Sequence, residues 1–289
     1  MNNLSAAAIS LVVTGLALAL AGLLSGPATL AGVPLLVALA ALAFVIQWSV
    51  YVPSFVKQTE HYYDLTGSLT YATVIVLALV FGAVDARAAV IGALVLVWCA
   101  RLGSFLFRRV KRDGKDGRFD DIKPQWGRFL MAWTFQGLWV FVTLLAALLA
   151  VTSPAAVGWD VFASLGLLVW MLGFSVEVIA DRQKAAFRSD PANRGRFITT
   201  GLWAWSRHPN YFGEIVLWTG IALMATPTFE GWQWLGWLAP LFVLWLLMKV
   251  SGVPLLEQRA DATWGGQPDY EAYKGRTPVL LPRPPRLDP

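Results

Sequence analysis

The first 56 residues of this chain contain no Lys, Arg, Asp or Glu, and long apolar segments of the same kind recur along the sequence. A helix needs about 20 apolar residues to cross the hydrocarbon core of a bilayer. Eight segments reach or approach this length: 6–24, 33–56, 68–84, 87–108, 128–151, 159–182, 211–227 and 232–251. The third and the seventh are short, so the pattern predicts seven to eight transmembrane helices.

The composition supports the same fold class. Hydrophobic residues make up 57% of the chain and charged residues 14%, whereas soluble domains contain about 25% charged residues. We therefore expect an all-α integral membrane protein, built as a bundle of transmembrane helices. The five residues before the first apolar segment include no Lys or Arg, so we interpret that segment as a retained helix rather than a signal peptide. Residues 1–56 would form N-terminal transmembrane helices, and residues 57–289 a larger transmembrane domain with the site and the tail.

Basic residues are distributed unevenly between the connections. Lys and Arg are frequent in 108–128, in 182–207 and in the tail, whereas 152–158 and 228–231 contain none. Because Lys and Arg are retained on the cytoplasmic side of a membrane, we expect the basic connections and both termini in the cytoplasm. Eight alternating spans then place the 57–67 connection on the same side. The net charge of +5 is thus a topology signal, and we expect no nucleic-acid partner.

Two polar clusters lie at the ends of apolar segments. Ser206–Glu214 contains His208, and Gln58–Asp64 contains His61, the other of the two histidines in the chain. Polar groups at a bilayer are costly to bury and usually face a cavity. Two histidines and a single cysteine, Cys99, are too few for a dedicated zinc site, so we expect no bound metal.

The first cluster and its surroundings predict an anion-binding pocket open to the cytoplasm. Glu177 and Asp181 are four residues apart, so they share one helix face. The same holds for Asn210 and Glu214. Pro209 suits the first turn of a helix, and the positive end of a helix favours a bound anion beside basic side chains. The further candidates for this pocket are Arg188, Arg196, Arg207, Glu257, Arg259, Tyr270, Glu271 and Tyr273.

The stretch Arg207–Glu214, with the sequence Arg-His-Pro-Asn-Tyr-Phe-Gly-Glu, resembles the C-terminal domain of the steroid 5α-reductase family. The bacterial membrane branch of that family, often labelled as a domain of unknown function (DUF1295-like), also has a Gln-Thr-Glu-x-x-x-Asp-Leu-Thr-Gly stretch. Here that stretch is Gln58–Gly67, and the tail Pro254–Tyr273 looks similar too. The resemblance covers about residues 55–282. It implies a multi-pass protein of a bacterial inner membrane that uses NADPH to reduce a carbon–carbon double bond conjugated to a carbonyl.

The resemblance also implies which residues contact the cofactor. The matching positions here are Arg112, Asp181, Arg188, Arg196, Asn210 and Glu214. Glu177 stands where the vertebrate members have Asn. His208 and Tyr211 belong to the same motif as Asn210, and we include them in the predicted cofactor site.

Near the substrate, the family has a Gln-Glu pair and a later Tyr. Two registers are open here, because the pair could be Gln58 with Glu60, or Tyr63 with Asp64. The later Tyr is replaced by Trp98, so the acid must come from nearby residues. Hydride addition to an enone leaves negative charge on the carbonyl oxygen, and a donor aimed at that oxygen contributes about 3–4 kcal/mol. The candidates for this catalytic role are Gln58, Glu60, Tyr62, Tyr63 and Asp64.

Two other functions compete with the reductase. Isoprenylcysteine and phospholipid methyltransferases have a similar Arg-His-Pro-x-Tyr-x-Gly stretch and bind S-adenosylmethionine with it. In a non-enzymatic lipid-binding protein, the arginines would only anchor helix ends, and Glu177 and Asp181 would pair with Arg182 and Lys184. A reductase would act on a hydrophobic substrate such as a 3-oxo-4-ene steroid, which partitions into the bilayer. The exact substrate and the oligomeric state stay open.

Overall fold

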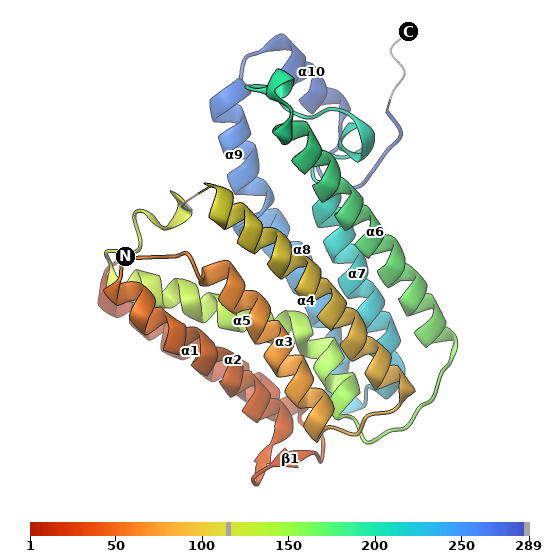
Figure 1. The fold of residues 1–289 in the computed structure, drawn as a ribbon. Helices are drawn as coiled ribbons and strands as arrows, with labels where there is room; N and C mark the ends of the chain where they lie inside the picture. Colours follow the sequence, from red (N-terminus) through yellow and green to blue (C-terminus); the bar gives the residue numbers. More distant parts are fainter. Residues whose placement is uncertain (114–116, 286–289) are drawn as a thin grey trace. The chain divides into compact units, whose positions relative to one another are not determined.

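The computed structural model describes residues 1–113 and 117–285, with the backbone alone for 105–113 and 118 (Figure 1). The chain forms two compact units, each built from helices. The first consists of Met1–Ala163 with Met224–Leu238, and the second of Ser164–Leu223 with Ala239–Pro289. Within the described residues, the strands are β1 (Thr29–Leu30) and β2 (Val33–Pro34), which pair as one short antiparallel hairpin.

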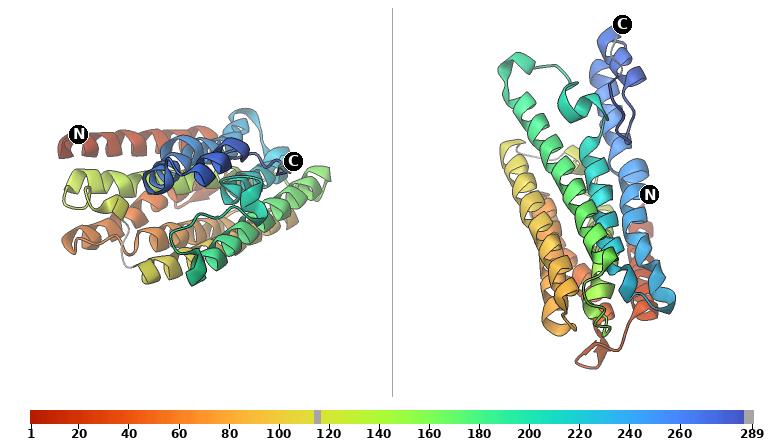
Figure 2. Two further views of the ribbon diagram at one scale, coloured as in Figure 1. Left: turned by 90° about the horizontal axis from the view of Figure 1, so that it is seen from above. Right: turned by 90° about the vertical axis from the view of Figure 1, so that its right-hand side faces the viewer.

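The first unit is organised around helix α5 (Trp126–Thr152), in which every residue from Val140 to Thr152 is buried. Four helices pack against it: α1 (Asn3–Leu24), α2 (Leu35–Val56), α3 (Tyr63–Phe81) and α4 (Ala86–Asp113). The turned views in Figure 2 show these helices running alongside one another. The outer helices expose apolar side chains such as Leu11, Val52 and Val80, as expected of helices that are apolar all round and face lipid.

Arg87, near the start of α4, is fully buried. Its guanidinium donates to the carbonyl oxygen of Gly158 at 2.8 and 3.1 Å and to that of Met224 at 2.7 Å. It also forms an ion pair with Asp160 at 2.8 Å. A buried charge is tolerated where it is paired and hydrogen-bonded. Arg87 therefore ties α4 to two segments that lie far along the chain.

The second unit contains most of α6 (Val161–Ser189) and α7 (Pro209–Ala225), and also α8 (Leu238–Trp245), α9 (Val253–Trp264) and α10 (Pro268–Arg276). Helices α6 and α7 pack backbone against backbone. A Cβ at Gly173 would lie 2.4 Å from the amide nitrogen of Leu217, and one at Gly213 would lie 2.6 Å from that of Glu177. Glycine permits such close approach between transmembrane helices. The predicted helix start at Pro209 is confirmed, and this packing sets it beside the predicted acidic face of α6.

The helical path is broken between α8 and α9. Helix α8 runs into a π-helical turn, Leu246–Val250, and the break follows at Gly252. A Cβ at Gly252 would lie 2.5 Å from the carbonyl oxygen of Leu247, so this position requires glycine. Pro254 then occupies the first turn of α9, where its missing N–H costs nothing. The break separates the apolar α8 from the charged α9.

The predicted fold class is confirmed, with small changes in the spans. By length and composition, seven helical segments among the described residues can cross a membrane: Asn3–Leu24, Leu35–Val56, Tyr63–Phe81, Ala86–Ser104, Trp126–Thr152, Val161–Ser189 and Gly231–Trp264. The predicted span 211–227 forms α7, which has only 17 residues. Helix α4 continues to Asp113, beyond the end of the predicted span 87–108. The cytoplasmic orientation and the division at residue 56 stay predictions.

Candidate functional site

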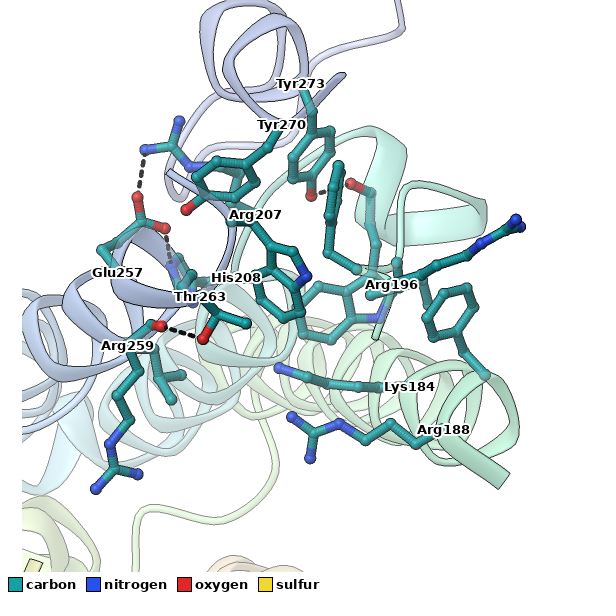
Figure 3. Close-up of a pocket in the computed structure, with 17 residues that line it drawn as sticks. Lys184, Arg188, Arg196, Arg207, His208, Glu257, Arg259, Thr263, Tyr270 and Tyr273 are labelled. Carbon is teal, nitrogen blue, oxygen red and sulfur yellow. Dashed lines mark hydrogen bonds and ion pairs between the residues drawn. The ribbon is translucent and has the colours of Figure 1, made fainter. Parts of the chain in front are cut away.

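The second unit contains a cavity of about 260 Å³ between the end of α6, the segment before α7, and helices α9 and α10 (Figure 3). We call it the basic cavity, because five of its lining side chains are cations and one is a carboxylate. The cations are Lys184, Arg188, Arg196, Arg207 and Arg259, and the carboxylate is Glu257. Lys184 and Arg188 extend side by side from α6, whereas Arg196 and Arg259 point away from them. The excess of positive charge favours an anionic ligand.

Glu257 on α9 holds the Arg-His pair in place. One of its oxygens lies 2.9 Å from a terminal nitrogen of Arg207, and the other lies 2.8 Å from Nε2 of His208. The guanidinium of Arg207 also donates to the carbonyl oxygen of Lys274 at 2.8 Å. The backbone N–H of Arg207 donates to the carbonyl oxygen of Pro278. The motif is therefore fixed from two sides, by α9 and by the C-terminal tail.

His208 is buried, and its ring stacks on that of Tyr211 with centroids 5.5 Å apart. Burial lowers the pKa of His208, and the hydrogen bond and charge of Glu257 oppose this effect only in part. The nearby charges of Lys184 and Arg207 lower the pKa further. His208 is thus held in its neutral form in the folded protein.

Aromatic side chains form the other wall of the basic cavity. The ring of Phe197 lies 5.6 Å from that of Trp264, 5.2 Å from that of Tyr270 and 5.6 Å from that of Tyr273. The hydroxyl of Tyr273 donates to the carbonyl oxygen of Trp203 at 2.8 Å. Burial raises the pKa of Tyr270 and that of Tyr273, so both hydroxyls stay protonated as donors.

The structure brings together eight of the predicted cofactor residues around this cavity: Arg188, Arg196, Arg207, His208, Glu257, Arg259, Tyr270 and Tyr273. Sequence reasoning left out Lys184 and the aromatic residues Phe197, Trp203 and Trp264. The signal that could have identified this wall is the close succession of aromatic and basic residues from Arg196 to Arg207.

The remaining predicted cofactor residues lie elsewhere. Asn210 Nδ2 donates to Oδ1 of Asp181 at 3.2 Å, across the contact between α6 and α7. Glu177 and Asp181 are both buried, and Glu214 follows one helical turn after Asn210. None of these four lines the basic cavity. Arg112 lies outside the residues whose side chains are described.

The first unit contains the predicted catalytic cluster, and Glu60 is its buried member. Oε2 of Glu60 lies 2.5 Å from Nζ of Lys123, which also lies 3.5 Å from Asp120. Burial alone would lower the pKa of Lys123, but Glu60 and then Asp120 outweigh this effect and raise it. Sequence reasoning left out Lys123, because 63 positions separate it from Glu60.

The other members of this cluster differ in their described surroundings. Tyr63 donates its hydroxyl to the carbonyl oxygen of Ala132 at 3.0 Å and packs on aromatic neighbours. Gln58 and Tyr62 are exposed, and Asp64 lies in the first turn of α3. The five candidates are Gln58, Glu60, Tyr62, Tyr63 and Asp64. Their catalytic role stays a prediction.

Trp98, which stands at the family's later Tyr position, lies against another tyrosine. Its ring packs on that of Tyr71 with centroids 5.1 Å apart, and both side chains are buried.

Comparisons with known proteins give one family match and several distant relatives. The family described as "Protein of unknown function (DUF1295)" matches residues 50–277. The chain is 27% identical to "Uncharacterized protein C594.04c" of Schizosaccharomyces pombe over 232 residues, which cover 68% of this chain and 64% of that protein. It thus spans less than two thirds of that relative. No solved structure shows significant similarity.

Two other relatives have descriptive names. "Delta(14)-sterol reductase LBR" of Gallus gallus is 34% identical over 94 residues, which cover 28% of this chain and 15% of that protein. "Probable O-methyltransferase ustE" of Ustilaginoidea virens is 30% identical over 142 residues, 44% of this chain and 48% of that protein. These matches are partial, whereas the family match covers most of the chain. The chain therefore belongs to the DUF1295 family.

Proposed function

We propose that the protein is a membrane-embedded reductase that uses NADPH to reduce a carbon–carbon double bond conjugated to a carbonyl in a lipid-soluble substrate. The observation that carries this proposal is the charge of the basic cavity, with five cations and one carboxylate. NADPH has a pyrophosphate and a 2′-phosphate, and basic side chains near the 2′-phosphate select it over NADH. The residues present therefore fit a phosphate-bearing cofactor.

The chain's own residues would bind and orient the cofactor. Arginine binds phosphate oxygens through two parallel hydrogen bonds. The guanidinium of Arg207 is held by Glu257 on α9 and by the carbonyl oxygen of Lys274 on α10, so its charge is fixed in position before a ligand binds. Lys184 and Arg188 extend from α6 as further cationic donors. When bound, NADPH would supply the hydride.

The enone end of the reaction needs a hydrogen-bond donor for the carbonyl oxygen. Glu60 is ion-paired with Lys123, so it accepts hydrogen bonds rather than donating them. Tyr63 donates its hydrogen to the carbonyl oxygen of Ala132. The ammonium of Lys123, held by Glu60 and Asp120, is a strong donor in this cluster. We therefore add Lys123 to the candidates, with Glu60 as the residue that positions it.

The two named relatives support different reactions. Similarity to a sterol reductase favours the reduction of a lipid. Similarity to a probable O-methyltransferase favours methyl transfer from S-adenosylmethionine, our second candidate. S-adenosylmethionine has no phosphate, and although it has one carboxylate, its sulfonium and ammonium groups make its net charge positive. The charge of the cavity therefore favours the reductase.

The test is a melting curve of the purified protein in detergent with NADPH, NADH or S-adenosylmethionine. A ligand at 100 times its Kd stabilises the folded state by about 2.7 kcal/mol. We expect NADPH to raise the melting temperature more than NADH, and S-adenosylmethionine to leave it unchanged. NADPH oxidation in the presence of a 4-ene-3-ketone steroid then tests the reaction. If S-adenosylmethionine alone raises the melting temperature, the reductase proposal fails and the methyltransferase is favoured.

A further inference from the structure

Another cavity, of about 390 Å³, lies in the first unit, where helices α1 and α5 end. Its wall consists of residues 23–27 at the end of α1, residues 153–154 after α5, and residues 230–233 at the start of the 3-10 helix Gly231–Trp237. We call it the α1–α5 cavity. The proposed function makes no use of it, because these residues lie outside both predicted polar clusters.

The surroundings of the α1–α5 cavity are negatively charged. Glu230 contributes a carboxylate, and none of the described lining residues is Lys or Arg. The C-terminal end of a helix bears about half a negative charge, which a basic side chain in the last turn can balance. Neither α1 nor α5 has a basic residue in its last turn. Two unbalanced helix ends and a carboxylate therefore meet at one cavity, and together they favour a cationic ligand.

The wall is also rich in hydrogen-bond acceptors. The last carbonyl oxygens of an α-helix have no partner within the helix, and two helices end here. Two side-chain donors of the wall are already engaged. Nε2 of Gln233 donates to the carbonyl oxygen of Leu24 at 3.2 Å. Oγ of Ser25 donates to the carbonyl oxygen of Ala21 at 2.7 Å. Glu230 accepts the backbone N–H of Gln233, but a carboxylate can accept about four hydrogen bonds. A ligand with several N–H groups therefore fits this wall.

The position of the α1–α5 cavity along the helices is that of lipid headgroups. The candidate spans α1, α5 and Gly231–Trp264 each begin or end at its wall. Trp232, in the wall, is 67% exposed. Tryptophan at the end of a span lies at the interface between lipid and water, and the face of its ring attracts a cation. Leu23, 53% exposed on α1, extends the wall to the apolar outer surface. These features favour a ligand that arrives from the bilayer.

We infer that the α1–α5 cavity binds the primary ammonium group of a phospholipid headgroup, as in phosphatidylethanolamine. An ammonium group donates three hydrogen bonds, and Glu230 would be its counter-ion. A choline headgroup has the same charge but no N–H, and a glycerol headgroup has no cation. Groups of three or more His, Cys, Asp or Glu side chains that could hold a metal ion are absent from the described residues. The inference does not depend on the proposed function.

The test compares headgroups on the same acyl chains. Full-length protein in detergent is titrated with phosphatidylethanolamine, phosphatidylcholine or phosphatidylglycerol, and the bound lipid is counted by native mass spectrometry. We expect phosphatidylethanolamine to bind about tenfold more tightly than either of the others, because only its headgroup offers charged N–H donors. Free ethanolamine, which lacks the acyl chains, should compete only at far higher concentration than the lipid.

Variants of the wall identify the groups that recognise the headgroup. Glu230→Gln removes the charge and keeps an oxygen that can cap the helix start. It should weaken phosphatidylethanolamine binding about tenfold and abolish the preference over phosphatidylcholine. Trp232→Leu should weaken this binding about threefold. The control is Asp269→Asn, at an exposed carboxylate of α10, which should keep the wild-type affinity. The melting temperature without lipid checks that each variant is folded.

Each outcome supports or overturns the inference. A preference for phosphatidylethanolamine that depends on Glu230 supports it. If the three lipids bind alike, or if Glu230→Gln keeps the wild-type preference, the cavity does not recognise an ammonium group and the inference is overturned. If free ethanolamine competes at the same concentration as the lipid, the assignment to a lipid is overturned. If Glu230→Gln does not fold, the comparison of headgroups on the wild-type protein still decides. None of these measurements involves NADPH, so a failure here leaves the proposed function intact.

Discussion

Asn210 Nδ2 donates a hydrogen bond to Oδ1 of Asp181 at 3.2 Å, and so joins the first turn of α7 to the buried face of α6. Both residues were predicted to contact the cofactor, yet neither lines the basic cavity. Asn210 lies two residues after His208, so this bond fixes the helix start that follows the Arg-His pair. Asn210 and Asp181 would therefore support the cofactor site by fixing the position of α7, without contacting the cofactor themselves.

Replacing Asn210 with Leu should destabilise the protein by about 1–3 kcal/mol, because the buried carboxylate of Asp181 loses a hydrogen-bond donor. Melting curves of Asn210→Leu, Asp181→Leu and the double variant give the coupling between the two side chains, which we expect to be about 0.5–3 kcal/mol. Additive losses would show that the bond contributes nothing to stability.

Replacing Gly213 with Ala should destabilise the contact between α6 and α7 by about 1–3 kcal/mol, as for other overpacked sites. The added Cβ would lie 2.6 Å from backbone atoms of Glu177 and Gly173, which cannot rotate away. The matched control is Gly15→Ala in α1, where no atom lies within 4 Å of the new Cβ. Equal melting temperatures for the two variants would contradict the close packing.

Removing residues 277–289 should lower NADPH affinity more than it lowers stability. The tail accepts hydrogen bonds from the Arg-His segment: the hydroxyl of Ser206 donates to the carbonyl oxygen of Leu280 at 2.9 Å, and the backbone N–H of Arg207 donates to that of Pro278. A shorter truncation that keeps residues 1–285 retains these bonds and serves as the control. If both truncated proteins bind NADPH like the full chain, the tail plays no part in holding Arg207.

Stability should fall as the pH is lowered from about 6.5, and His208 should account for much of this dependence. Burial lowers the pKa of His208 in the folded protein, whereas the unfolded chain keeps the ordinary value of about 6.5. Below that pH the unfolded state binds a proton that the folded state does not, so protonation favours unfolding. His208→Gln should flatten the dependence of the melting temperature on pH below about 6.5. His61→Gln should keep the wild-type slope.

Replacing Lys123 with Met should lower turnover on a steroid enone by about 10²–10³ while NADPH affinity is unchanged. A donor to the developing enolate oxygen acts on a charge that the ground state lacks, so its loss falls on the transition state. Lys57→Met, at an exposed lysine, is the control. Full turnover by Lys123→Met would mean that Tyr63, Asp64 or another residue is the donor to the enolate oxygen.

Most of the membrane-spanning fold could be predicted from the sequence, because lipid demands long apolar helices wherever the chain crosses it. The predicted first turn at Pro209 also agrees with the structure. The distribution of charge along the sequence indicated which arginines would line the basic cavity, because the start of a helix and the basic side chains near it favour the same bound anion.

The contacts that join distant segments could not be predicted in this way. The aromatic wall depends on Phe197 meeting Trp264 and Tyr273 from separate helices. Lys123 lies in a basic connection, 63 positions from Glu60, so no local pattern joins the two residues. The close contact at Gly213 and Gly173 gives no local signal, because glycine is common in membrane helices for several reasons.

The full burial of Arg87 has a consequence for how the protein is made. Its partners are the carbonyl oxygens of Gly158 and Met224, which follow it by 71 and 137 positions. During synthesis, α4 emerges long before either carbonyl exists, and an unpaired guanidinium cannot settle into an apolar interior. Gly158 and Asp160 become available first, and the set of partners is complete only after Met224 has been made. The first unit cannot close before most of the second has been translated, so biogenesis of the two units is coupled through one side chain.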